Sequence, residues 1–234
     1  MCVVALALHQ HPDWPVILIG NRDEFHARAS APVHAWDDGS GIIAGRDLVG
    51  GGTWLGVQAG ARRLVVVTNV KGERGPEADQ ASRGVLVRDL LTGAGEFAAA
   101  TADQLGGFRG FNLLALVDGQ TRLLTNRPAP LVRDLRDGIH ALANEVIDDN
   151  APRATRLNKL VEQWRGSGHS PQMLLDQLAA GDAPPLFLND SVYGTRCSTL
   201  VAIGKDGRGE MIERRFGPSG APIGERCLIF GWGG

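Results

Sequence analysis

The sequence predicts an α+β fold, a four-layer αββα sandwich of two antiparallel sheets flanked by helix pairs. Glycine contributes 32 of 234 residues and falls between short apolar runs, a spacing typical of many short strands joined by tight turns. The expected order is strands, two helices, strands, two helices, strands. Helices in pairs do not give the strand–helix alternation of a parallel sheet. Since no internal linker is visible, we expect a single domain over residues 1–234.

In the first half of the chain, apolar runs separated by Gly-rich turns predict five strands, over residues 2–9, 16–21, 42–45, 53–58 and 63–68. Two helices follow. The first, over 83–91, has Ser82 as a candidate N-cap, and the second, over 96–105, is rich in alanine and has good helix propensity.

The second half repeats the pattern, with strands predicted over residues 111–117, 121–126 and 138–144. Helices are expected over 152–164 and 171–178. Ser170 is placed to cap the last helix, and Pro171 stands at its first position, where a missing N–H costs nothing. Three strands, over 198–204, 209–214 and 227–230, close the chain.

The charge distribution excludes some functions. The formal net charge is −2 with both signs interspersed, which argues against nucleic-acid binding. No apolar run reaches the roughly 18 residues that a transmembrane helix needs, and the run 2–8 lacks the preceding basic region of a secretory signal. The three cysteines are far apart, which predicts free thiols and a cytoplasmic location, without a metal site: Cys2, Cys197 and Cys227.

Cys2 is the first candidate for chemistry, because removal of Met1 would place a thiol and a free α-amine on one residue. An α-amine has a pKa of about 7.7–8.0 and can act as a base near neutral pH. The thiol, with a pKa of about 8.5, needs only a modest decrease to become a thiolate. A nucleophile beside its own base is a route to acyl transfer. The alternative is a small apolar residue that begins a buried strand.

A polar stretch, Gly-Asn-Arg-Asp-Glu-Phe at residues 20–25, follows the second apolar run. We expect it at the end of a strand. Arg22 can lower the thiol pKa by its charge, and Asp23 or Glu24 can orient the α-amine. The alternative is a charged turn with surface ion pairs.

Three motifs in order resemble the NRDE family, also called the transport and Golgi organisation family: Met1-Cys2, Asn21-Arg22-Asp23-Glu24 and Gly51-Gly52-Thr53-Trp54-Leu55-Gly56. The resemblance implies haem trafficking, and acyl-coenzyme A or related lipid metabolites as a second ligand class. None of the six histidines has metal-ligand spacing, so haem is expected only as cargo and no cofactor is required.

The chain also resembles, more distantly, the penicillin V acylase and bile-salt hydrolase group, in its Met-Cys start, its Thr125-Asn126-Arg127-Pro128 segment and its Arg153-x-x-Arg156 pair. That resemblance implies an N-terminal-nucleophile hydrolase scaffold, on which Asn126 helps to hold the cysteine amine or substrate and Arg153 supports the thiolate. The order Asn-Arg-Asp-Glu differs from the Arg-Asn-x-Asp of those enzymes, and this chain is shorter.

Two functions are therefore expected, an amide or thioester hydrolase and a non-catalytic carrier of haem or acyl-coenzyme A. A pure scaffold protein is a third reading. Asn69, at the end of a strand, is a candidate oxyanion donor. The expected catalytic residues are Cys2, Arg22, Asp23, Glu24, Asn69, Asn126 and Arg153, and the expected substrate-binding residues are Asn21, Thr53 and Trp54.

Overall fold

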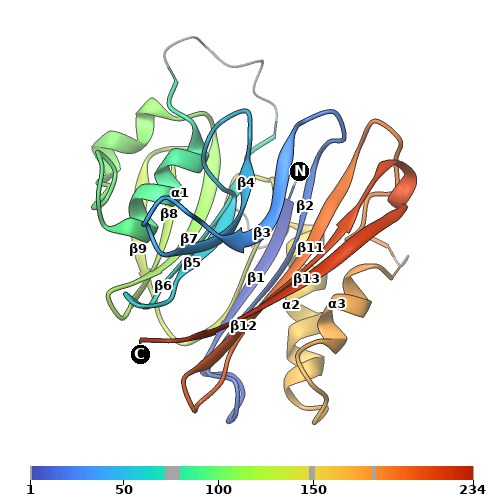
Figure 1. Ribbon diagram of the computed structural model, residues 1–234. Coiled ribbons are helices and arrows are strands. Elements are labelled where there is room, and N and C mark those ends of the chain that lie inside the picture. Colours follow the sequence, from blue (N-terminus) through green and yellow to red (C-terminus); the bar gives the residue numbers. More distant parts are fainter. Residues whose placement is uncertain (1, 72–79, 148–150, 181–182, 234) are drawn as a thin grey trace. The chain divides into compact units, whose positions relative to one another are not determined.

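The computed structural model describes residues 2–71, 80–147, 151–180 and 183–233, and its strands form two antiparallel sheets with few helices (Figure 1). This confirms the α+β class. The described residues divide into two compact units that alternate along the chain. The first contains those within 2–28, 137–143 and 151–231, and the second contains those within 29–136, 144–147 and 232–233. No helix among the described residues is long and apolar enough to cross a membrane.

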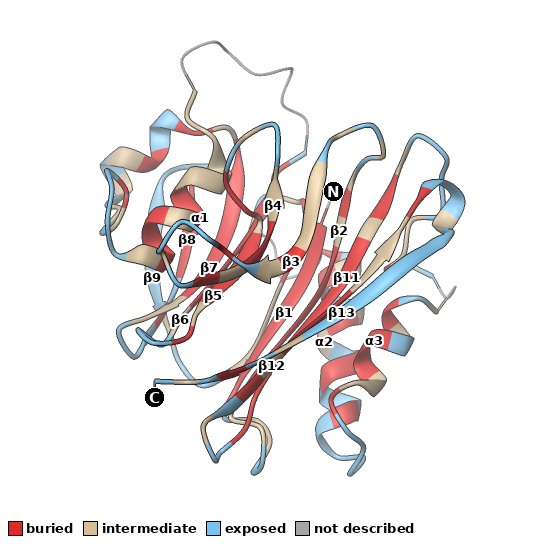
Figure 2. Cartoon of the chain, in the orientation of Figure 1, coloured by how far each residue is buried: buried red, intermediate tan, exposed pale blue. Residues whose placement is uncertain are grey.

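A six-stranded sheet with the order β10-β1-β2-β11-β12-β13 forms the first unit. Alternate side chains of its central strands, such as Val3, Ile19 and Leu200, join one core with the helices. Figure 2 shows these central strands mostly in the colour of buried residues. Trp164 and Leu157 supply the helix side of that core. The elements are β1 Cys2–Leu8, β2 Val16–Phe25, β10 Gly138–Leu142, α2 Pro152–Arg165, α3 Met173–Leu178, β11 Tyr193–Ile203, β12 Arg208–Phe216 and β13 Pro222–Gly231, with the 3-10 turn η2 Pro218–Gly220.

The second unit is built on a seven-stranded sheet in sequential order, β3 to β9. One face packs against α1, and Phe97, Phe108 and Phe111 meet edge to face within its core. The elements are β3 Ser30–Ala35, β4 Ile42–Asp47, β5 Leu55–Gln58, β6 Arg63–Asn69, α1 Arg83–Thr92, η1 Ala102–Gly107, β7 Phe111–Val117, β8 Gln120–Thr125 and β9 Leu131–Leu135.

The glycines before β5 allow a close approach of two backbones. A Cβ built on Gly52 would lie 2.2 Å from the carbonyl carbon of Gly84, in the first turn of α1. A Cβ built on Gly51 would meet open space, but the φ of this residue is +74°. Glycine is therefore favoured at position 51 only because of the backbone conformation. The Gly-Gly-Thr-Trp motif is therefore a packing device of the second unit.

The polar stretch lies at the end of a strand, as expected, but the strand is longer than predicted. β2 continues to Phe25 instead of ending at residue 21, so Asn-Arg-Asp-Glu forms its last part. The reason is long-range pairing, because β11 begins at Tyr193, earlier than predicted, and pairs with β2 as far as Phe25. Strands β3 and β9 were not expected, and β13 begins at Pro222, earlier than the sequence indicated.

The helix predictions also need correction. The helix expected over 96–105 does not form; the segment contains the 3-10 turn η1 instead, preceded by a capping box at Thr101. The first of the two predicted helix pairs is thus one α-helix and a 3-10 turn. Ser82 occupies the N-cap position of α1, but its side chain makes no capping hydrogen bond. Helix α3 begins at Met173 after Gln172, so Ser170 and Pro171 do not start it.

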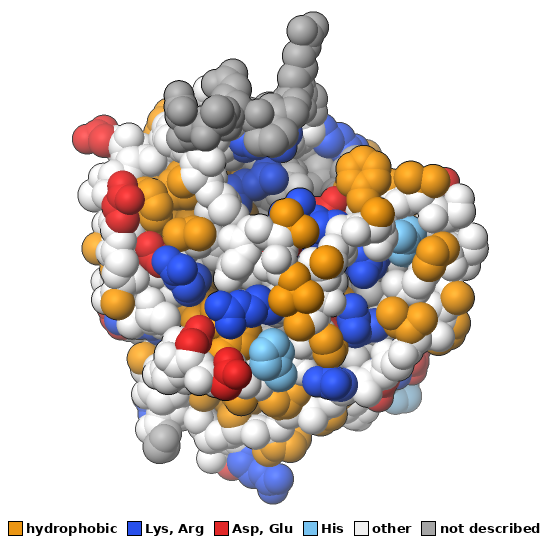
Figure 3. All heavy atoms as spheres, turned by 45° about the horizontal axis from the view of Figure 1, so that its top comes forward, with side chains coloured by type: hydrophobic (Ala, Val, Ile, Leu, Met, Phe, Trp, Pro, Cys, Tyr) orange, Lys and Arg blue, Asp and Glu red, His pale blue; other side chains and the backbone are white. Residues whose placement is uncertain are grey.

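The surface keeps the mixture of charges that the sequence predicts. On the face shown in Figure 3, Lys and Arg side chains lie among acidic and hydrophobic ones.

Candidate functional site

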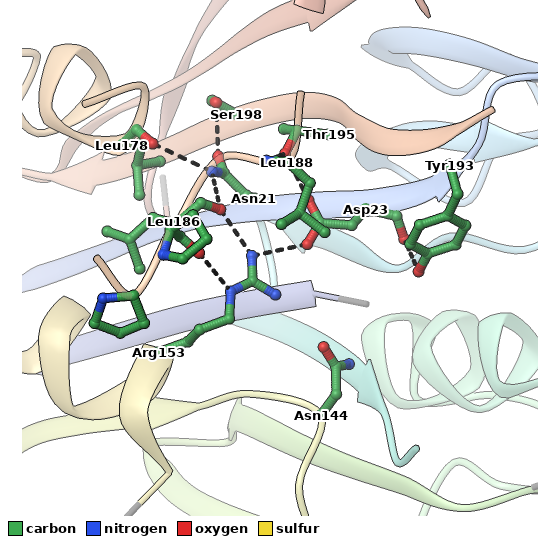
Figure 4. Close-up of polar contacts among 12 residues, drawn as sticks. Asn21, Asp23, Asn144, Arg153, Leu178, Leu186, Leu188, Tyr193, Thr195 and Ser198 are labelled. Atoms are coloured by element: carbon green, nitrogen blue, oxygen red, sulfur yellow. Dashed lines mark hydrogen bonds and ion pairs between the residues drawn. The ribbon is translucent and has the colours of Figure 1, made fainter. Parts of the chain in front are cut away.

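Asp23 is the centre of a buried polar network in the first unit (Figure 4). Along β2, Asn21 and Asp23 continue the alternation of Ile17 and Ile19, so their side chains face the helices. The Asp23 side chain is inaccessible to solvent, and its Oδ2 lies 2.8 Å from Arg153 Nη2. Thr195 Oγ1 donates to Asp23 Oδ1 at 2.7 Å. Burial raises the pKa of the Asp23 carboxyl, and the Arg153 charge and the Thr195 hydrogen bond oppose that rise.

Arg153, in the first turn of α2, joins this network to the segment before β11. Its Nη2 also donates to the Leu186 carbonyl at 2.7 Å, and its Nε donates to the Pro185 carbonyl at 3.0 Å. Its Nη1 is buried and has no hydrogen-bond partner within the described part of the chain. The predicted Arg153–Arg156 pair thus anchors the helix, since Arg156 Nη1 donates to the Pro184 carbonyl at 2.7 Å.

Asn21 is held by the protein itself. Its Nδ2 donates to the Leu186 carbonyl at 2.9 Å, and its Oδ1 accepts from Ser198 Oγ at 2.6 Å. The amide therefore ties β2 to β11 and to the segment that carries Leu186. This gives Asn21 a structural explanation beside its predicted role in substrate binding.

Cys2 lies on the other face of the sheet, directly across from Arg22 in the antiparallel register. The thiol is buried, with Cys2 5% exposed. Burial is the main cause that raises the pKa of the Cys2 thiol, and the negative charge of Asp23 adds to it. The Arg22 charge and the backbone N–H of Asp23 act in the opposite direction. The structure thus brings Cys2, Arg22 and Asp23 together, and leaves the thiol protonated near neutral pH.

Glu24 is oriented toward arginines. Its Oε2 lies 3.6 Å from Arg22 Nη2 and 4.0 Å from Arg28 Nε. Its Oε1 accepts from the N–H of Phe25. Of the two acids predicted to orient an amine at Cys2, Asp23 is the one whose charge affects the Cys2 thiol.

The remaining predicted residues belong to the second unit. Asn126 is buried; its Oδ1 accepts from the N–H of Phe111 at 3.0 Å, and its Nδ2 donates to the Leu105 and Phe108 carbonyls. The Thr53 hydroxyl donates to the Leu55 carbonyl at 2.8 Å. Trp54 packs against the core of this unit. These contacts explain the three residues structurally, and the roles predicted for them in binding stay predictions.

Three polar residues of interest were missed by the sequence reasoning. Thr195 and Tyr193, whose hydroxyl donates to the Asp23 carbonyl at 3.0 Å, come from β11 and belong to no motif. Asn144, in the second unit, is buried; its Nδ2 donates to the Asn69 carbonyl at 2.7 Å. Its Oδ1 has no partner among the described residues. A polar residue at the end of the strand predicted over 138–144 was the available indication.

The thiols are expected to differ in accessibility. Cys2 and Cys197 are buried and Cys227, on β13, is exposed. Burial raises the pKa of both buried thiols, so at any pH below those values less thiolate is present than for an ordinary cysteine. We expect iodoacetamide near neutral pH to add one group to the folded protein and three groups after unfolding in urea, counted by intact mass. Cys227→Ser should add none while folded; rapid labelling of Cys2 would contradict the buried position.

The fold and this site define the class of protein. It is an α+β protein in which the first strand begins at a cysteine and the neighbouring second strand carries the Asn-Arg-Asp-Glu motif. A family model described as Transport and Golgi organisation 2 matches residues 1–183. The chain belongs to this family, as its motifs predicted. The match ends before β11, so Tyr193 and Thr195 lie outside it.

Curated relatives agree. Transport and Golgi organization protein 2 of Drosophila melanogaster is 30% identical over 158 residues, 59% of this chain and 55% of that protein. The Mus musculus homolog is 29% identical over 165 residues, 63% of this chain and 58% of that protein. The Homo sapiens homolog is 29% identical over 204 residues, 79% of this chain and 67% of that protein. The chain thus spans little more than half the length of the first two.

Proposed function

We propose that the chain is an acyl hydrolase for amides or thioesters, with Cys2 as its nucleophile once Met1 has been removed. The observation that carries the proposal is the surroundings of Cys2 within the first unit. Arg22 lies directly across from it, and the Asp23 charge reaches its thiol. Asp23 is itself fixed by Arg153 and Thr195 at 2.8 and 2.7 Å. A buried cysteine with a purely structural role does not need such charged neighbours.

In the proposed reaction, the α-amine of Cys2 accepts the thiol proton and the sulfur attacks the substrate carbonyl, so that an S–C bond forms. The leaving amine or thiol takes the proton as its bond to the carbonyl breaks. Water then hydrolyses the acyl-enzyme and restores the thiol. Arg22 favours the thiolate by its charge, Asp23 orients the amine, and Arg153 holds Asp23. Glu24 modulates Arg22 by its charge.

The test is trapping of an acyl-enzyme, followed by intact mass, in a Cys227→Ser background that removes the exposed thiol. With Met1 removed, an acyl thioester should add one acyl group, which disappears with time as the free acid accumulates. Cys2→Ala should lose both adduct and turnover, whereas Cys197→Ala, on the same sheet face, should keep them. Turnover that survives Cys2→Ala would refute the nucleophile.

The carrier function has its own support, because the thiol is buried and its pKa is raised. On that reading the same region binds haem or acyl-coenzyme A reversibly and forms no product. Stoichiometric binding that is lost on changing Arg22 or Glu24 but kept in Cys2→Ala would favour the carrier. Release of product with repeated turnover would exclude it.

A further inference from the structure

A row of four side chains crosses the sheet on the face that carries Cys2. The antiparallel register places Cys2 across from Arg22, Arg22 across from Cys197, and Cys197 across from Arg215. Side chains directly opposite each other in an antiparallel pair lie on the same face. A β-bulge between Thr195 and Cys197 adds Arg196 at this point. Thiols and guanidinium groups therefore alternate along the row.

Arginine and glutamate side chains lie around this row. Arg22 and Arg28 share Glu24, at 3.6 and 4.0 Å, and Arg215 lies 3.9 Å from Glu213. These separations are longer than the roughly 2.7–2.9 Å of a charge-assisted hydrogen bond. Burial lowers the pKa of Arg196, and the charges of Arg22 and Arg215 lower it further, so these three arginines lie close enough to act on one another.

Arg22 and Arg196 differ in their hydrogen bonds. Nη1 of Arg196 donates to the carbonyls of Phe25, His26 and Arg28, so this side chain closes the turn after β2. The Arg22 side chain is only 11% exposed, yet its sole polar contact within the described residues is Glu24 at 3.6 Å. A planar guanidinium fits a carboxylate or phosphate with two parallel hydrogen bonds, and the long contact to Glu24 does not form them.

From this arrangement we infer that Arg22 and Arg215 bind an oxyanion group of the substrate. The inference rests on the proposed function and narrows its substrate class to acyl compounds that carry an anionic group. Neighbouring strands are about 4.8 Å apart, so Arg22 is one spacing from Cys2 and Arg215 is three. An anion between the two arginines lies roughly 10 Å from the thiol. That distance suits a carboxylate several bonds from the reacting carbonyl, as at the far end of a glutaryl group.

The test compares four thioesters, glutaryl and pentanoyl groups each carried on N-acetylcysteamine and on coenzyme A. The protein is Cys227→Ser with Met1 removed, and the rate of Cys2 acylation is followed by intact mass. In each case the Cys2 sulfur bonds to the carbonyl carbon, and the leaving thiol departs with the Cys2 proton. On the neutral carrier, glutaryl should react about tenfold faster than pentanoyl, as one charged hydrogen bond allows. If the coenzyme A thioesters react faster than the N-acetylcysteamine thioesters whatever the acyl group, the bound anion is a phosphate of coenzyme A. Equal rates for all four thioesters would overturn the inference.

Substitution of single arginines tests whether this row causes the preference for glutaryl over pentanoyl thioesters. Arg215→Ala should bring the glutaryl-to-pentanoyl ratio close to one while the pentanoyl rate is kept, because Arg215 takes no part in the proposed chemistry. Arg208→Ala, an exposed arginine at the start of the same strand, should keep the ratio. An unchanged ratio in Arg215→Ala would refute this assignment. Should that variant fail to fold, Arg215→Gln offers the same loss of charge with a longer side chain.

Anion binding at Arg22 and Arg215 can also be measured by thermal unfolding, which does not depend on acylation of Cys2. Glutarate and pyrophosphate are then used as probes of the thermal midpoint of the wild-type protein. A ligand bound only by the folded state raises that midpoint. We expect a rise with one of them that Arg215→Ala abolishes and Arg208→Ala retains. The absence of any rise in the wild-type protein would overturn the inference.

Discussion

Replacement of Arg153 by alanine is expected to lower the free energy of unfolding by about 3–5 kcal/mol, the usual cost of breaking a buried ion pair from one side. The Arg153 side chain is 12% exposed and that of Asp23 is inaccessible, so solvent cannot replace the lost partner. The change also leaves the Leu186 and Pro185 carbonyls without the hydrogen bonds that Arg153 donates. Urea unfolding with an unchanged m-value measures the loss.

Two variants make this result interpretable. Arg165→Ala, at the last residue of the same helix, removes an exposed hydrogen bond to Gln10 and should change stability by no more than about 0.5 kcal/mol. Arg153→Met combined with Asp23→Leu should recover much of the loss, since no charge is then left buried. A cost for Arg153→Ala no greater than that of Arg165→Ala would show that the pair does not hold α2 in place.

Gly52→Ala is expected to destabilise the protein by about 3 kcal/mol, at the upper end of the range for overpacking. The new methyl group would lie 2.2 Å from the Gly84 carbonyl carbon and 2.3 Å from its oxygen. Both atoms belong to the backbone of α1, so no flexible side chain can move aside. Helix α1 would have to shift as a unit, and its buried leucines would shift with it.

Gly51→Ala is the matched control, because this neighbour has φ of +74° and nothing within 4 Å of a built Cβ. Only the left-handed backbone conformation is penalised there, by about 1–2 kcal/mol. Thermal unfolding of both variants beside the wild-type protein gives the comparison. Equal losses at the two positions would mean that α1 moves away from Gly52 without cost.

The local sequence pattern was enough to predict the two strands that carry Cys2 and Arg22. Both lie on one hairpin, β1 and β2, whose apolar runs are close in sequence and whose turn is short. The position of Cys2 at the start of the first strand, and the adjacency of the Asn-Arg-Asp-Glu strand, followed from those runs. The family followed from the same motifs.

Where propensity and packing disagreed, packing decided. The alanine-rich segment 96–105 favours a helix by propensity, but Phe97 and Leu105 are both buried in the core of the second unit. A 3-10 turn with its own capping box forms instead. Strand β9, with mostly exposed side chains, had no apolar pattern to reveal it.

The sequence by itself determined the α+β class, the hairpin that begins at Cys2 and the polar stretch on its second strand, because alternation and turn residues act over a few positions. Only the tertiary structure decided what surrounds Asp23. Arg153 is 130 positions away and Thr195 is 172 positions away, and no local pattern records their pairing. The entry of β11 beside β2 extended that strand to Phe25 and set the row Arg22, Cys197, Arg215. Strand partners distant in sequence are chosen by burial of the whole sheet.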